Sequence, residues 1–111
     1  MEFKASHRHA KISPTKAKPV ADLIRDKHVN DALEILRTTP NRGAKLIDKV
    51  LRSAMANADQ EPATDMDNLR VKSIWVDQGP TRAGWRPRAR GRVERRKKRS
   101  SHINIVLDDG Q

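Results

Sequence analysis

Cysteine is absent from this 111-residue chain, which excludes disulfide frameworks, cysteine-ligated zinc, iron–sulfur clusters and thiol catalysis. Aromatic residues make up only 3% of the chain, and no apolar run approaches the roughly 18 residues that a membrane span needs. The N-terminal residues lack the apolar stretch that a signal peptide requires. We therefore expect one soluble domain in a reducing compartment, the cytoplasm, without a membrane partner.

Acidic residues are also scarce, since 14 Asp and Glu face 24 Lys and Arg, and the net charge is +10. Most of the excess lies in residues 79–100, where ten basic residues and a single acidic one give +9. Residues 1–19 carry +4, whereas residues 20–78 are nearly neutral at −1. Protein surfaces seldom concentrate so much charge of one sign without a polyanionic partner. A solvated arginine surface is the alternative.

The basic segment, residues 79–100, contains only Trp85 and Val93 as large apolar residues, so it cannot form a core of its own. It lies between two segments with strand character, residues 69–77 and 102–107. Antiparallel pairing of these two segments makes residues 78–100 one long hairpin, with its turn expected near Gly84 and Pro87. About eleven residues on each side would project ~35 Å beyond the core.

Three helices are expected before the first of these strands. Ser13 and Pro14 have the types preferred at a helix start, although Pro19 implies a kink or a start nearer Pro19. Asn30 can cap a short second helix that ends before Pro40. Asn41 opens the clearest helix, which reaches about residue 59 with apolar residues at helical spacing, and residues 61–68 follow as a loop.

Residues 69–77 place apolar side chains on both parities of the expected strand. Leu69, Val71 and Trp75 share one parity, whereas Ile74 and Val76 share the other. A strand with this pattern is either covered on both faces or interrupted by a bulge.

Arginine occupies every second position from 86 to 92, which on an extended strand puts four guanidinium groups on one face about 6.6 Å apart. This spacing suits successive phosphates of a nucleic acid, and phosphate contacts carry no base specificity. Trp85 could stack on a base or anchor the hairpin by packing against it.

Sequence signals for catalysis or metal binding are weak. His7 and His9 could lie on one strand face as metal ligands, but no third ligand stands at a recognisable spacing. Residues 65–68 begin like a calcium loop and lack its glycine and terminal glutamate. Phosphate-binding glycine loops and nucleophile elbows are also missing. We expect no enzyme activity, no cofactor and no metal.

Several sequence blocks resemble, in order, the L22 family of large-subunit ribosomal proteins. The blocks are HRHAKISPTKA (residues 7–17), VADLIR (20–25), DALEIL (31–36), KVLRSAMANA (49–58), VDQGP (76–80), PRARGR (87–92) and HINIVL (102–107). The resemblance implies an α+β fold, with three helices packed on a small antiparallel sheet and a long extended basic β-hairpin. It implies one domain over residues 1–111, with a globular body at 1–78 and 101–108 and a protruding arm at 79–100.

The resemblance also implies a function: a structural constituent of the large ribosomal subunit that binds ribosomal RNA early in assembly. The hairpin tip would line the exit tunnel for the nascent peptide beside ribosomal protein L4, and no homo-oligomer is expected. Together with the charge pattern, it predicts RNA-binding residues in the N-terminal region, the arm and the strand that follows: Arg8, His9, Lys11, Lys16, Lys18, Arg25, Arg82, Arg86, Arg88, Arg90, Arg92, Arg95, Arg96, Lys97, Lys98, Arg99 and His102. The residues carried over to the tunnel tip are Arg82, Ala83, Gly84, Trp85, Arg86 and Pro87.

Two other functions compete with this one. A DNA-bending architectural protein would use the basic hairpin as an arm and Pro87 as a wedge between base steps, although such proteins usually act as two-fold dimers. A metal-dependent nuclease using His7 and His9 is a more distant alternative. Composition does not separate RNA from DNA, because both are polyanions.

Overall fold

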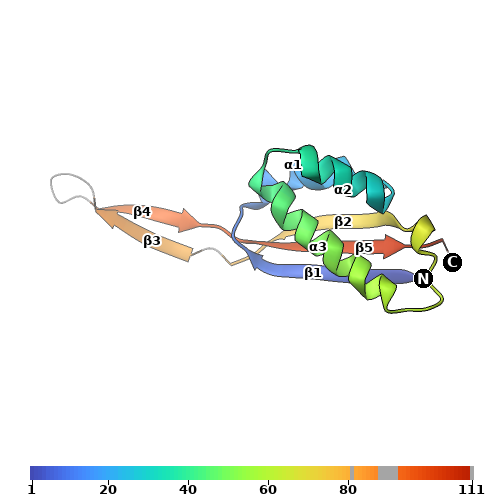
Figure 1. Cartoon of the computed structure of the whole chain (residues 1–111). Helices are drawn as coiled ribbons and strands as arrows, with labels where there is room; N and C mark the ends of the chain where they lie inside the picture. The colour runs from blue at the N-terminus through green and yellow to red at the C-terminus, as the bar shows by residue number, and fades with distance from the viewer. Residues whose placement is uncertain (81, 88–92, 111) are drawn as a thin grey trace.

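The protein is an elongated α+β molecule of 64 × 24 × 17 Å (Figure 1). The computed structural model describes residues 1–80, 82–87 and 93–110, with the backbone alone for 82–87 and 93–98. The elements follow in the order β1 (Glu2–Ala10), α1 (Pro14–Ile24), α2 (Val29–Thr38), α3 (Arg42–Asp59), a 3₁₀ turn (Met66–Asn68), β2 (Arg70–Gln78), β3 (Arg82–Pro87), β4 (Val93–Lys98) and β5 (Ser101–Asp108).

An antiparallel sheet of order β1–β5–β2 carries all three helices on one face (Figure 1). Helix α3 lies against β1 and β5, α1 lies against β2, and α2 packs on both other helices. Ile103, Ile105 and Leu107 of the central strand are fully buried and share one core with Ile47 and Leu51 of α3. The structure thus confirms the expected fold class, three helices on a small antiparallel sheet.

Strand β2 is bulged, which explains its apolar residues on both parities. Val71 pairs with Leu107 and Ser73 with Val106, so the register shifts between Val71 and Ser73. After the bulge, Ile74 and Val76 are buried and Trp75 is 43% exposed. Of the two sequence alternatives, the bulge is the one that the structure shows.

Helix α1 begins at Pro14 and continues through Pro19, so a start nearer Pro19 is wrong. Pro19 lies on the exposed side of the helix, where water can satisfy the carbonyl that a proline cannot bond.

Helix α2 is capped by His28 rather than by Asn30, which corrects a second expectation. The Nδ1 atom of His28 accepts the amide of Asn30 at 3.2 Å, and its Nε2 lies 2.7 Å from the carbonyl oxygen of Asp67. The predicted ends are confirmed for α2, which stops at Thr38, and for α3, where the Asn41 side chain accepts the Gly43 amide at 2.8 Å.

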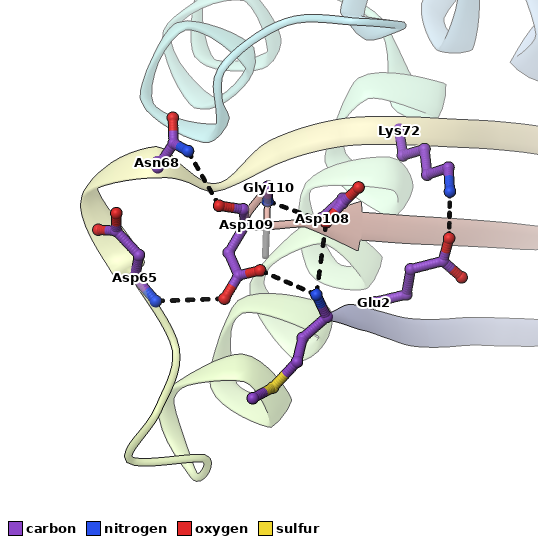
Figure 2. Close-up of polar contacts among 8 residues, drawn as sticks. Glu2, Asp65, Asn68, Lys72, Asp108, Asp109 and Gly110 are labelled. Atoms are coloured by element: carbon purple, nitrogen blue, oxygen red, sulfur yellow. Dashed lines mark hydrogen bonds and ion pairs between the residues drawn. The ribbon is translucent and has the colours of Figure 1, made fainter.

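The end of the body farthest from β3 and β4 is closed by a polar cluster around Asp109 (Figure 2). The buried Asp109 carboxylate lies 3.0 Å from the α-ammonium of Met1 and accepts the amide of Asp65 at 3.2 Å. The backbone carbonyl oxygen of Asp109 accepts a hydrogen bond from the side-chain amide of Asn68 at 2.9 Å. These contacts join β1, β5 and the loop before β2.

Candidate nucleic-acid interface

The arm, defined as residues 79–100, leaves the body where β2 ends and β5 begins. The amide of Gly79 donates to the carbonyl of Ser100 at 2.9 Å, and the Ser100 hydroxyl donates to the Pro80 carbonyl at 2.8 Å. The buried Ser101 hydroxyl donates to the Ile12 carbonyl at 2.6 Å. The root of the arm is therefore tied to itself and to the segment between β1 and α1.

Gly79 leaves no space for a side chain at this root. A Cβ there would lie 2.5 Å from the Ser100 Oγ and 3.2 Å from the Ser100 carbonyl carbon. We expect Gly79→Ala to lower the free energy of unfolding by about 1–3 kcal/mol, because either the serine or the backbone must move. Urea titration measures the effect.

Ser100→Ala is the matched control, since it removes the nearest clashing atom. In that background the added methyl at position 79 should cost less, with a coupling of at least about 0.5 kcal/mol between the two sites. Strictly additive effects would show that the two residues do not compete for the same space.

Strands β3 and β4 form a two-stranded antiparallel ladder that projects from the body (Figure 1). Arg82 pairs with Lys98 at the end nearest the body, and Pro87 pairs with Val93 at the far end. The turn was expected near Gly84 and Pro87. Gly84 lies within the ladder opposite Arg96, so a turn at Gly84 is wrong, whereas Pro87 is the last paired residue of β3. The six residues carried over to the tip, Arg82 to Pro87, make up the whole of β3, and only its Pro87 end is distal.

The basic residues predicted for the arm fall into two groups. Seven lie on the described ladder or just after it, and Arg88, Arg90 and Arg92 lie outside the described residues. The face shared by the alternating arginines stays a prediction. The seven are Arg82, Arg86, Arg95, Arg96, Lys97, Lys98 and Arg99.

Basic residues of the body and the arm root meet around one surface hollow of about 990 Å³, here called the neck hollow. Three of its residues were predicted from the N-terminal region, and Arg99 was predicted from the arm. The hollow is lined by His9, Lys11, Ile12, Ser13, Lys16, Asn41, Arg42, Pro80, Arg99 and Ser100.

A β-bulge turns the chain into this hollow. The register of β1 against β5 shifts between His7 and Ala10, and His9 takes a positive φ of 59°. The His9 amide donates to the Nδ1 atom of His102 at 3.1 Å, and the two rings meet edge to face at 5.0 Å. His102, itself a predicted RNA contact, thus supports His9 from the neighbouring strand.

The remaining predicted residues lie outside the neck hollow. Arg8 and Lys18 are exposed on β1 and α1. Arg25 lies near the other end of α1, where its guanidinium donates to the Asp22 carboxylate at 2.6 Å and to the Ile74 carbonyl at 3.0 Å. These bonds give Arg25 a structural role in joining α1 to β2.

Sequence reasoning missed Arg42, the first residue of α3. A signal was present, because a cation at the start of a helix faces the positive end of the helix dipole and is disfavoured there. An arginine directly after the N-cap Asn41 therefore calls for a reason outside helix stability.

Among residues 1–80 and 99–110, whose side chains the structure describes, no three His, Asp or Glu residues gather in a way that could hold a metal ion. No helix in those ranges combines the length and the apolar character needed to cross a bilayer.

Comparison with known proteins assigns the family. The profile described as "Ribosomal protein L22p/L17e" matches residues 5–108. The large ribosomal subunit protein uL22 of Syntrophus aciditrophicus is 51% identical over 109 residues, which cover 98% of this chain and 99% of that protein. The uL22 proteins of Syntrophobacter fumaroxidans and Pelotomaculum thermopropionicum are each 50% identical, over 96% and 98% of this chain and 97% and 96% of their own lengths. With an α+β body, a projecting basic ladder and matches over almost the whole chain, this protein belongs to the ribosomal protein L22p/L17e family.

Proposed function

We propose that the protein binds large-subunit ribosomal RNA, mainly through its arm, and that this binding supports subunit assembly. Membership of the L22 family makes it a constituent of the large ribosomal subunit, located on ribosomes in the cytoplasm. The proposal adds that contacts between the arm and ribosomal RNA hold the chain in the subunit. Its role is structural, without a catalytic step.

The observation that carries the proposal is the position of the charge. The arm holds +9 of the net +10 and projects from a body whose residues 20–78 are nearly neutral. A two-stranded ladder exposes both of its faces along its length, so cations on it can meet phosphates on more than one side. This geometry favours a ribbon inserted between RNA segments over a flat contact.

Binding to RNA can be tested directly against the DNA-bending alternative. The full chain should bind a large-subunit ribosomal RNA transcript more tightly than duplex DNA of equal length at 0.15 M salt, and it should co-sediment with large subunits. Equal affinity for both nucleic acids, with no co-sedimentation, would favour the architectural DNA-binding protein.

We further propose that the Pro87–Val93 end of the arm lies at the wall of the peptide exit tunnel, near ribosomal protein L4 and the nascent peptide. The register of β3 against β4 supports the Pro87–Val93 end, and not the Arg82 end, as the part that reaches the tunnel wall, because Arg82 pairs at the end nearest the body. The end farthest from the anchored root reaches deepest into any RNA that surrounds the arm.

A shortened arm tests the tunnel proposal. Deleting residues 84–86 together with 94–96 removes three facing pairs, keeps the remaining register and shortens the ladder by ~10 Å. We expect the variant to enter large subunits, because the root and most basic residues remain, but to lose photo-crosslinks from the arm's far end to a nascent peptide. Crosslinking at the wild-type level would place the nascent peptide's contact elsewhere.

A matched control separates arm length from arm composition. Replacing the other five of these six residues by alanine, with Gly84 retained, keeps the ladder length and removes the same charges. This control should retain the crosslinks. If it loses them as fully as the deletion does, side chains rather than reach determine the contact.

A further inference from the structure

We propose that the neck hollow is a second RNA-binding site, which holds a sugar–phosphate segment of the RNA that passes the root of the arm. This inference rests on the proposed function and adds to it a site where the body meets the root of the arm. The hollow collects four cations, Lys11, Lys16, Arg42 and Arg99, and none of the described residues that line it carries a carboxylate.

Some other cations of the body are paired with carboxylates. Arg25 pairs with Asp22 at 2.6 Å and Arg52 with Asp48 at 3.0 Å, and Lys72 pairs with Glu2. Within the part of the chain that the structure describes, no ion pair involves the four cations of the hollow. Their positive charge is therefore available to an anion from outside.

Two of the cations occupy positions that disfavour positive charge. Lys16 lies in the first turn of α1 and Arg42 is the first residue of α3, and neither helix has an acidic residue in its first turn. Helix α2, which does not line the hollow, has Asp31 at the corresponding place. The cations and the two helix ends repel each other, and an anion between them relieves this repulsion.

Close packing brings the two helix starts together. A Cβ on Gly43 would lie 3.3 Å from the Ile12 Cδ1 atom and 3.4 Å from the Lys16 carbonyl oxygen. With hydrogen in place of Cβ, the first turn of α3 rests directly on the residues that open α1. Lys16 and Arg42 are therefore fixed on one hollow by backbone packing.

Size and chemistry favour a length of nucleic-acid backbone over a single inorganic ion. A hollow of about 990 Å³ has the volume of a site for a nucleotide-sized ligand. Lysine and arginine suit phosphates, and Ser13, Asn41 and Ser100 offer hydrogen bonds to ribose hydroxyls. Ile12 and Pro80 add an apolar wall against which a sugar can lie.

The test compares two double variants of the full chain. Lys16→Gln with Arg42→Gln removes two charges from the hollow. Lys27→Gln with Arg70→Gln removes two exposed charges that lie outside the hollow. Binding to a large-subunit ribosomal RNA transcript is measured between 0.05 and 0.5 M salt, and thermal unfolding is followed in parallel.

The hollow variant should lower the salt slope by about 1.4–1.8 and weaken binding about 25- to 60-fold at 0.1 M salt, because two phosphate contacts are lost. The control should change the slope by less than about 0.5. Lys16→Arg with Arg42→Lys, which keeps both charges, should restore most of the slope.

Lysine acetylation of the wild-type complex gives a second, mutation-free measurement. RNA should slow the acetylation of Lys11 and Lys16 and leave that of Lys27 unchanged. Equal salt slopes for hollow and control variants, or equal acetylation of the three lysines, would overturn the second site while the arm's role stands. Failure of the wild-type chain to prefer ribosomal RNA over duplex DNA would instead overturn the proposed function, and this inference with it.

Discussion

Neutralising four arginines of the arm should weaken binding to a large-subunit ribosomal RNA transcript by roughly 10³-fold at 0.1 M salt and lower the salt slope by about 2.8–3.6. Each phosphate contact contributes ~0.7–0.9 to the slope of log affinity against log salt. Its contribution to the affinity falls to nothing near 1 M salt. The measurement is a series of binding isotherms between 0.05 and 0.5 M salt. The substitutions are Arg88→Gln, Arg90→Gln, Arg92→Gln and Arg95→Gln.

The control lowers the net charge from +10 to +6 in the same way, but on the body. Its four cations are exposed and lie outside both the arm and the neck hollow. If RNA responds to overall charge alone, the two variants will lose equal affinity. A much smaller loss for the control assigns the effect to the arm. The control substitutions are Lys27→Gln, Arg37→Gln, Lys49→Gln and Arg70→Gln.

Features with a local cause were predictable from the sequence. Helix α3 was predicted with its N-cap because the Asn41 cap and the apolar spacing act within one element. The pairing of β2 with β5 followed from two strand-like segments on either side of a run with only two large apolar residues. The concentration of charge in the arm is a property of composition and needs no fold to be seen.

Features set by tertiary contacts were not predictable in this way. Strand β1 has weak apolar alternation, since its contribution to the core comes from Phe3, Ala5 and Ala10, and it is a strand because it pairs with the edge of β5. His28 caps α2 because the preceding residues also pair with the start of β2, where the Lys27 carbonyl accepts the amide of Val71 at 2.8 Å. The conformation of His28 therefore depends on both α2 and β2, and not on the local sequence alone.

In the candidate site, too, some features follow from the local sequence and others depend on tertiary contacts. Lys11 and Lys16 were found by their charge, but their meeting with Arg42 depends on how α3 packs against α1 through Gly43. The place of Gly84 in the ladder depends on the register of β3 against β4. Glycine favours a turn locally, and the pairing of β3 with β4 over six residues each overrode that preference.

Replacing Asp109 by alanine should lower the free energy of unfolding by about 2–4 kcal/mol, the largest stability effect that we expect from a single polar substitution in this chain. Its carboxylate is fully buried and accepts from two groups of distant segments, the Met1 ammonium at 3.0 Å and the Asp65 amide at 3.2 Å (Figure 2). Alanine leaves the Asp65 amide without this acceptor and opens a space between β1, β5 and the loop before β2.

Asp108→Ala is the matched control, because the neighbouring carboxylate is 27% exposed and lies farther from the Met1 ammonium, at 3.7 Å. We expect it to cost less than about 1 kcal/mol, since water can replace its bonds. Asp109→Asn should fall between the two, because the amide oxygen can still accept from Asp65 while the charge is lost. Urea titration followed by circular dichroism gives the three values, and equal costs at positions 108 and 109 would show that burial of the Asp109 carboxylate contributes nothing to closing this end of the body.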